Sequence, residues 1–301
     1  MLASLAGHLR GASTLTLYLL NTVFWCSLLF PVAFLKLILP LAGWRRICNR
    51  VLHAIATAWV GCNNVNQRLV GRVRCRLAEF PDLQRRGWYL VLANHQSWVD
   101  ILVLQRIFYR RIPFLTFFLK RELIWVPLLG LAWWALDFPF MKRYSKKLLA
   151  RKPHLKGRDL ETTRRACEKF RQLPVTVMNF VEGTRFTRAK QDRQGSPYRH
   201  LLRPKSGGAA FVLSAMGGQL DRVLDVTIAY PPGPKSFWAF LCGRIREVKV
   251  SVRALPVGDE LIGDYFQDPV FRERFQDWLN DLWHEKDRVM DRLCLPMPEA
   301  T

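Results

Sequence analysis

The stretch that decides the fold is Tyr89 to Asp100, which reads Tyr-Leu-Val-Leu-Ala-Asn-His-Gln-Ser-Trp-Val-Asp. Tyr89 to Ala93 have apolar, strand-like character, a polar turn follows, and Trp98 to Tyr109 continues with helical periodicity. The pattern predicts a strand, a turn and a helix, with His95 at the tip of the turn. Ligands of open α/β sheets bind beyond the carboxyl ends of strands, so His95 is a candidate functional residue.

Asp100 follows His95 by five residues and falls in the first turn of a helix that begins at Ser97. From there its carboxylate can point back toward the imidazole. A His-carboxylate pair is the minimum equipment for general-base catalysis, because the carboxylate fixes the tautomer and stabilises the imidazolium. Ser97 to Asp100 also fits a capping box, in which Asp100 satisfies the backbone amide of Ser97. The spacing alone leaves both interpretations open.

Composition points to an anionic partner. The chain has 301 residues, half of them hydrophobic, which suffices for one large domain or two small ones. It carries 46 Lys and Arg against 24 Asp and Glu, a net charge of +22. Nucleic acid, a phospholipid surface and phosphorylated small molecules all suit such a charge. The seven cysteines are scattered without a Cys-x-x-Cys pair, which indicates reduced packing cysteines and predicts no metal site or disulfide.

The N-terminal region predicts a membrane anchor. Thr14 to Leu35 has no charged side chain, and its 22 residues would form a helix of about 33 Å, the thickness of a bilayer's hydrocarbon core. The run is too long for a signal peptide. Pro31, Lys36 and Pro40 leave open whether the helix is a kinked span or re-enters.

More basic residues follow this apolar run than precede it, so the positive-inside tendency places the remainder of the chain in the cytoplasm, at the inner membrane if the cell is bacterial. Val51 to Val60 reads as a second apolar helix that could pair with the first. We therefore predict an anchor of one helix or a helical pair over residues 1–65 and a catalytic domain over residues 66–301.

The globular part alternates strands and helices. Strands are predicted near residues 73–77, 89–93, 175–180, 224–229 and 246–252, and helices near residues 99–109, 159–172 and 207–215. A last helix begins at Asp268-Pro269, with Phe271, Phe275, Trp278 and Leu282 on its apolar face. This alternation predicts an α/β fold with a mixed, partly parallel sheet covered by helices.

Two further segments allow two interpretations each. Leu123 to Phe140 is rich in Trp, Leu and Pro and suits either the membrane interface or a core helix. Met141 to Arg165 is strongly basic and is either a solvated loop or a contact for anionic headgroups.

A second polar turn follows the strand predicted at Val175 to Phe180, and it reads Val181-Glu182-Gly183-Thr184-Arg185. Glycine lets backbone amides approach a ligand closely, and arginine offers a planar fork of donors, so the turn suits a phosphate or an oxyanion. A salt bridge between Glu182 and Arg185 in an ordinary turn explains the same residues equally well.

Taken together, the two turns resemble the glycerolipid acyltransferase family, which includes the lysophosphatidic acid acyltransferases. The family has a histidine-four-residues-aspartate block and a Glu-Gly-Thr-Arg-like block at this kind of interval. Two looser blocks are similar to Phe138 to Arg143 and Val226 to Pro231. The chain departs from the pattern at Val181, where many members have proline, and ahead of Arg143, which lacks the usual Ile-Asp.

The resemblance implies a reaction in which an acyl thioester, acyl-CoA or acyl carrier protein, meets lysophosphatidic acid at the membrane, with no other cofactor. His95 would be the general base and Asp100 would orient it. Arg143 and Arg185 would bind the acceptor's phosphate, and Glu182, Gly183 and Thr184 would shape that pocket. Lys205 is a further candidate contact.

Three rival interpretations remain. The acceptor could be another lysophospholipid, or the chain could be a non-catalytic basic protein that binds membranes or nucleic acid. No nucleic-acid fold signature occurs, so we expect no nucleic-acid partner. A serine hydrolase would need a Gly-x-Ser-x-Gly elbow, and neither the sequence around Ser206 nor that around Ser214 matches it.

Overall fold

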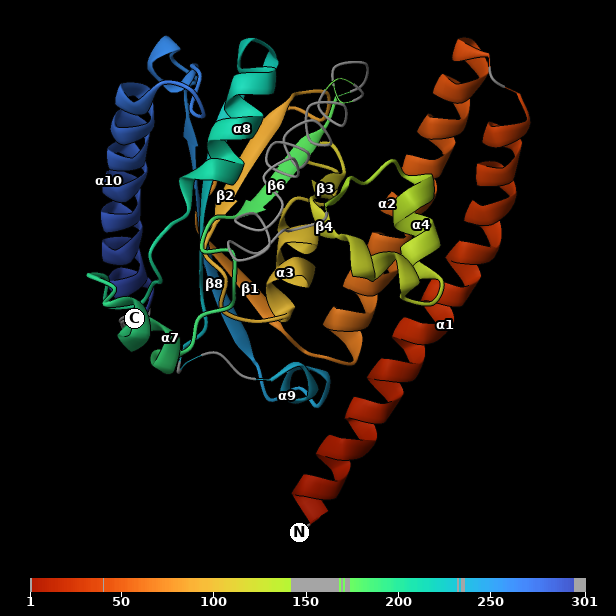
Figure 1. Cartoon of the computed structure of the whole chain (residues 1–301). Coiled ribbons are helices and arrows are strands. Elements are labelled where there is room, and N and C mark those ends of the chain that lie inside the picture. The colour runs from red at the N-terminus through yellow and green to blue at the C-terminus, as the bar shows by residue number, and fades with distance from the viewer. Residues whose placement is uncertain are drawn as a thin grey trace, which may run out of the picture.

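One mixed sheet forms the centre of the molecule. The computed structural model describes residues 2–39, 41–141, 168, 170, 174–231, 233 and 236–294 (Figure 1). Six strands lie in the order β1-β8-β7-β2-β6-β3, and every neighbouring pair is parallel except β7 with β8. The strands of this sheet are β1 (Arg74–Glu79), β2 (Tyr89–Ala93), β3 (Leu115–Phe117), β6 (Thr176–Phe180), β7 (Arg222–Ala229) and β8 (Glu247–Leu255). The predicted mixed, partly parallel sheet is confirmed.

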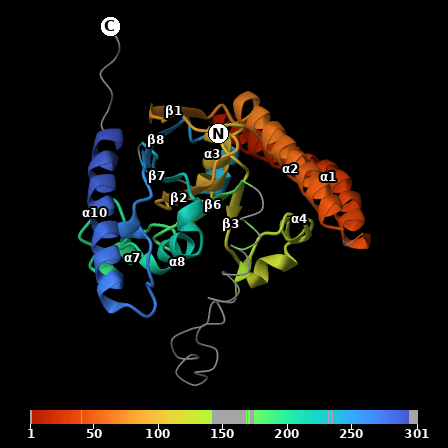
Figure 2. The ribbon, with the colours of Figure 1, turned by 90° about the horizontal axis from the view of Figure 1, so that it is seen from above.

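Helices cover both faces of the sheet (Figure 2). On β2 the side chains alternate, so that Leu90 and Leu92 join the core beneath α8 and α10, whereas Val91 and Ala93 join the core beneath α3. All five residues of β2 are buried, as expected for a central strand with helices on both sides. The helices of this part are α3 (Val99–Ile107), α7 (Arg188–Gln194), α8 (Ser206–Met216), α9 (Phe237–Leu241) and α10 (Pro269–Cys294), with short 3-10 turns at Gly217–Gln219 and Asp259–Leu261.

The N-terminal residues form a helical hairpin. Helix α1 (Leu2–Ile38) and helix α2 (Ala42–Leu69) lie side by side, and α2 lies between α1 and the sheet (Figure 1). Asn21 ties the two helices together, since its Nδ2 donates to Asn63 Oδ1 at 2.8 Å and to the carbonyl of Trp59 at 3.1 Å. The helical pair allowed by the sequence is therefore present, and its second helix continues to Leu69.

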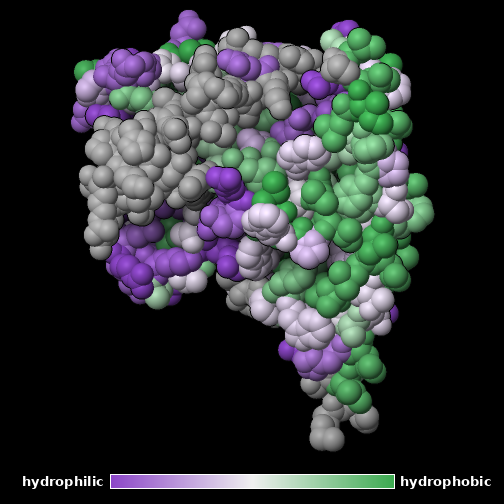
Figure 3. Space-filling view, turned by 45° about the vertical axis from the view of Figure 1, so that its right-hand side comes forward, coloured by the Kyte–Doolittle hydropathy of each residue, from purple (hydrophilic) through white to green (hydrophobic). Residues whose placement is uncertain are grey.

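The outer face of the hairpin is apolar. Helix α1 is long and apolar enough to cross a membrane, and only 17% of its most apolar window is buried. The space-filling view shows hydrophobic side chains gathered over the N-terminal helices (Figure 3). A large exposed apolar surface of this kind marks a membrane or partner contact in folded proteins.

The segment Leu123 to Phe140 is partly packed in the core and partly exposed. A 3-10 helix (Arg121–Trp125) overlaps its start, and α4 (Leu129–Ala135) lies within it. Its last residue begins β5 (Phe140–Met141), which pairs with β4 (Leu119–Lys120) just before the segment. Ala132 and Ala135 pack in a core shared with α1, whereas Trp125 is 85% exposed. The basic stretch that follows Met141 and the helix predicted at residues 159–172 lie outside the described residues, apart from two positions.

Helix α10 is fixed to the sheet by its apolar face and by one buried charge. It starts as predicted, with Asp268 Oδ1 accepting hydrogen bonds from the backbone of Val270 and Phe271 at 2.9 and 3.1 Å. Lys286 is wholly buried, and its Nζ donates to Asp225 Oδ1 on β7 and to the carbonyl of Val226 at 2.7 Å. This ammonium therefore links the helix to the middle of the sheet.

Removing that ammonium should destabilise the fold. Lys286→Met removes the donor from Asp225 Oδ1 and from the carbonyl of Val226, while Arg253 still pairs with Asp225 Oδ2 at 2.6 Å. Breaking a buried ion pair from one side costs about 3 kcal/mol. Thermal unfolding of the detergent-solubilised protein would measure the loss. Arg288→Met, on the exposed side of the same helix beside Glu285, is the matched control and should cost less than about 1 kcal/mol. Equal effects of the two changes would contradict the role of Lys286.

Candidate active site

The turn after β2 brings His95 and Asp100 together at the carboxyl edge of the sheet. His95 Nδ1 lies 2.8 Å from Asp100 Oδ2, and the Asp100 side chain has no exposure to solvent. The same Oδ2 accepts hydrogen bonds from the backbone amides of Gln96 at 2.6 Å and Ser97 at 2.9 Å. Both contacts expected from the sequence are therefore present, because one carboxylate accepts a hydrogen bond from the amide of Ser97 and lies against the imidazole.

The other oxygen of Asp100 is held by a tyrosine from a distant strand. Tyr230, directly after β7, donates its hydroxyl to Asp100 Oδ1 at 2.6 Å. Burial, followed by the charge of Asp100, raises the pKa of Tyr230 well above its usual range, so the phenol stays a neutral donor. Four donors therefore surround this carboxylate. Sequence reasoning missed Tyr230, and its place directly after a buried strand was the available signal.

This arrangement sets the tautomer of His95. A carboxylate that accepts three other hydrogen bonds accepts a fourth from Nδ1–H, which leaves the lone pair on Nε2 to act on a substrate. The imidazole also stacks on Phe180 at the end of β6, with ring centroids 3.9 Å apart. Asn94 secures the base of the turn, because its side chain exchanges two hydrogen bonds with the backbone of Ile228 on β7.

The second turn lies beside the first because β6 pairs with β2 in parallel register. Glu182 is wholly buried, and its Oε1 accepts a hydrogen bond from the backbone of His95 at 3.3 Å. In return, the carbonyl of His95 accepts one from the backbone of Phe186 at 2.7 Å. Glu182 thus holds the two turns against each other and has no exposed surface with which to contact a ligand.

The exposed basic groups of the second turn face solvent beside His95. The Arg185 guanidinium lies 4.5 Å above the ring of Trp98, so the alternative of a simple Glu182 to Arg185 salt bridge does not hold. Gly183 has a positive φ of 68°, and a Cβ there would lie 3.4 Å from Lys205 Nζ. Thr184 Oγ1 accepts a hydrogen bond from Lys190 at 2.8 Å. Of the predicted phosphate ligands, the structure brings together Gly183, Thr184, Arg185 and Lys205. Arg143 lies outside the described residues.

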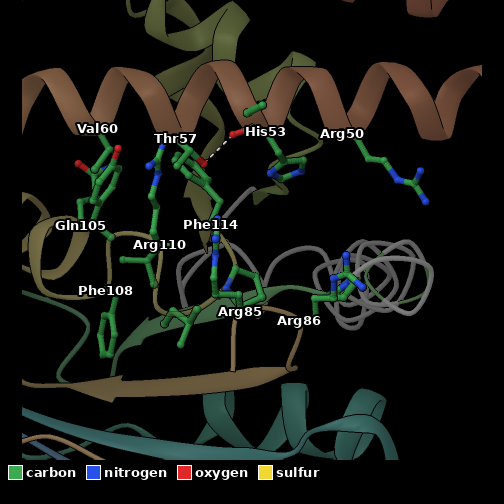
Figure 4. Close-up of a pocket in the computed structure, with 16 residues that line it drawn as sticks. Arg50, His53, Thr57, Val60, Arg85, Arg86, Gln105, Phe108, Arg110 and Phe114 are labelled. Carbon is green, nitrogen blue, oxygen red and sulfur yellow. Dashed lines mark hydrogen bonds between the residues drawn. The ribbon is translucent and has the colours of Figure 1, made fainter. Parts of the chain in front are cut away.

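A hollow of about 710 Å³ lies at the opposite edge of the sheet (Figure 4). Arg50, His53 and Thr57 on α2 face it, and Arg85 and Arg110 lie across from them (Figure 4). Its lining includes residues that precede β2 and β6, whereas His95 and Glu182 follow those strands. The length of a strand therefore separates this hollow from the His95–Asp100 pair.

Comparison with known proteins identifies the family. The sequence profile described as Acyltransferase matches residues 74–231, which spans both turns and Tyr230. The chain belongs to this acyltransferase family. The resemblance drawn from the two turns is thereby confirmed, and the domain that contains them is an acyltransferase-family domain.

Curated relatives include 1-acyl-sn-glycerol-3-phosphate acyltransferase gamma of Homo sapiens, 26% identical over 57% of this chain and 44% of that protein. Lysocardiolipin acyltransferase 1 of Danio rerio is 29% identical over 42% of this chain and 33% of that protein. This acyltransferase-family chain spans about half the length of the curated relatives it matches.

The fold of this family member has a solved counterpart. The 1-acyl-sn-glycerophosphate (LPA) acyltransferase PlsC from Thermotoga maritima superposes with a TM-score of 0.59 over 98% of both chains, at 18% identity. Because the match covers nearly the whole of each chain, it includes the N-terminal helices as well as the sheet. The likeness supports the α/β fold of the acyltransferase-family chain.

Stability should depend on pH through Glu182. Burial raises its pKa to about 8, although hydrogen bonds from the backbone of His95 and Leu202 act in the opposite direction. The folded protein thus retains a proton that the unfolded chain releases above about pH 4.3. The stabilising contribution of this carboxyl is complete below that pH and is lost as the pH rises through about 8.

Glu182→Gln keeps the shape of the protonated carboxyl and cannot ionise. The variant should therefore lose less thermal stability than the wild type when the pH is raised from about 5 to about 8. A series of unfolding midpoints across this range is the measurement. Glu273→Gln, at an exposed position of α10, is the control and should follow the wild-type curve. Parallel curves for wild type and Glu182→Gln would contradict the buried, protonated carboxyl.

Proposed function

We propose that the chain is a membrane-attached O-acyltransferase that moves an acyl group from a thioester to the free hydroxyl of lysophosphatidic acid. The observation that carries the proposal is the His95 to Asp100 pair, held at a sheet edge beside the exposed Arg185 and Lys205. A base next to two cations suits a nucleophilic alcohol that carries a phosphate.

The geometry supports a direct transfer. His95 Nε2 takes the proton of the acceptor hydroxyl as its oxygen attacks the thioester carbonyl. The carbon–sulfur bond then breaks, and the leaving thiolate receives the proton from His95. Asp100 stabilises the imidazolium between these two steps, while Arg185 and Lys205 hold the acceptor's phosphate. General-base assistance of this kind contributes roughly 10² to 10⁴-fold, and the positioning of both substrates adds to it.

Attachment to the membrane follows from the hairpin. Both ends of α1 contact the catalytic part, because His8 accepts a hydrogen bond from Trp238 at 3.1 Å and Lys36 pairs with Asp137 at 2.6 Å. Because α1 contacts the catalytic part at both ends, a perpendicular crossing of the bilayer by α1 would place the catalytic part inside the bilayer. We therefore infer that α1 lies in the membrane plane with its exposed apolar face in one leaflet. The basic charge that follows α1 supports the cytoplasmic side.

Two alternatives are weaker. Another lysophospholipid would satisfy the same catalytic pair, and the similarity to a lysocardiolipin acyltransferase supports this option. A non-catalytic basic protein would not require a buried carboxylate that accepts four hydrogen bonds, one of them from an imidazole. This option therefore lacks support from the site.

The purified protein in mixed micelles should transfer a labelled acyl group from acyl-CoA to lysophosphatidic acid. Parallel assays should offer lysophospholipids with larger headgroups as acceptors. They should also offer acyl carrier protein thioester as the donor. We expect the highest kcat/KM with lysophosphatidic acid, because Arg185 and Lys205 can both reach an unsubstituted phosphate monoester. No transfer to any acceptor would overturn the proposed reaction, and a clear preference for another headgroup would overturn the choice of acceptor.

A substitution at Arg185 tests whether this residue binds the acceptor. Arg185→Gln should raise KM for lysophosphatidic acid by about tenfold, because a hydrogen bond to a charged group contributes about 1.5 kcal/mol or more. KM for the thioester should stay the same. Arg193→Gln, an exposed arginine of α7, removes the same charge from the surface and should change neither constant.

A further inference from the structure

Seven arginines surround a hollow of about 960 Å³ that the proposed acyl transfer does not use. Five of them are exposed at its rim: Arg68, Arg72, Arg74, Arg76 and Arg246. Arg10 from α1 and Arg106 from α3 are half-buried within it, and Arg106 donates to the carbonyl of Val73 at 2.9 Å. The residues come from α1, α2, α3, β1, the turn before β1 and the segment just before β8. They therefore come together only when the chain folds.

The positive charge of this arginine hollow is almost uncompensated by carboxylates. Among the described residues that line it, Glu247 is the one carboxylate, and it pairs with Arg76 at 2.5 Å. Within the described part of the chain, the other six arginines have no carboxylate partner. Six unpaired guanidinium groups around one concave space repel one another and create a strongly positive potential. A multiply charged anion is the ligand that relieves this repulsion.

The hollow opens on the catalytic edge of the sheet. Arg74 starts β1 and is paired in register with Glu247, which starts β8. Because β8 runs antiparallel to β7, the start of β8 lies at the edge where β7 ends, and this is the edge that carries His95. Tyr230 follows β7 and donates to Asp100, and Cys75, in the lining of the hollow, belongs to β1, two strands away in the sheet.

The hollow and the Arg185 turn lie on opposite sides of the catalytic histidine. In the sheet, β6 with its Glu182 to Arg185 turn is on one side of β2, and β7, β8 and β1 are on the other. Neighbouring strands are about 4.8 Å apart, so β8 and β1 lie roughly 10 to 14 Å from β2. An enzyme that joins two phosphorylated substrates at one base needs two anion sites, one on each side of it.

We propose that the arginine hollow binds the phosphate groups of the acyl donor, a nucleotide thioester of the coenzyme A type. This inference rests on the proposed acyl transfer. A volume of about 960 Å³ suits a nucleotide, since small-molecule sites occupy about 300 to 1,000 Å³. Guanidinium forks bind phosphate oxygens in pairs, and a pantetheine arm is long enough to span from β8 to His95. A concave site of this size favours a small molecule over an acidic carrier protein or a bilayer surface.

The test compares two triple variants that lose the same charge. Arg72→Gln, Arg74→Gln and Arg246→Gln together remove three rim arginines, whereas Arg85→Gln, Arg86→Gln and Arg110→Gln remove three from the opposite edge of the sheet. Each set contains one arginine at positive φ, Arg72 at 53° and Arg110 at 58°, so the two sets also match in backbone strain. Both are assayed with acyl-CoA and with S-acyl-pantetheine, which has no phosphate.

We expect the rim variant to raise KM for acyl-CoA by about tenfold or more, since each lost contact to a phosphate costs about 1.5 kcal/mol or more. Its KM for S-acyl-pantetheine should be unchanged, and the opposite-edge variant should match the wild type with both donors. Calorimetry with the adenosine bisphosphate fragment of coenzyme A should show binding to the wild type and at least about tenfold weaker binding to the rim variant.

Three results would overturn the inference while the acyl transfer stands. They are an unchanged KM for acyl-CoA in the rim variant, transfer from acyl carrier protein alone, and a rim variant that loses only its binding to anionic phospholipid vesicles. Failure of the wild type to transfer from any donor would instead overturn the proposed function, and the calorimetry would still decide whether the hollow binds nucleotide phosphates.

Discussion

The buried carboxylate of Asp100 is the interaction on which the rest of the site depends. It accepts hydrogen bonds from His95, from two backbone amides of the turn and from Tyr230, directly after β7. A charge without exposure to solvent is tolerable only where such donors replace water. The sheet therefore has to place β2 next to β7, and α3 has to start where it does, before the imidazole can be oriented.

The sheet also organises the chemistry around this pair. Parallel pairing of β2 with β6 sets the exposed Arg185 on one side of His95, with the buried Glu182 fixing the two turns together. On the other side, the antiparallel β8 begins at the same edge, beside the start of β1, and the arginine hollow lies there. The hairpin of α1 and α2 packs beside the sheet and carries an exposed apolar face of the kind that contacts lipid.

The local features of the fold could be predicted from the sequence, and its long-range contacts could not. The strand Tyr89 to Ala93 and the start of α10 at Asp268 carry strong local signals, and both were predicted correctly. The three-residue strand β3 is too short to give a period, and Lys286 reads as a surface residue although it is wholly buried. The contact of Tyr230 with Asp100 and the gathering of Arg10 with Arg246 join residues far apart in the chain, so no sequence window contains them.

The central claim is that one imidazole, held by Asp100, removes the proton from a lipid alcohol. The most direct test is the rate of acyl transfer by His95→Ala in washed membranes, measured beside the wild type at equal protein and with thermal stability as a check on folding. A fall of roughly 10² to 10⁴-fold with the stability retained is the predicted result. A variant that keeps most of the wild-type rate would contradict the account.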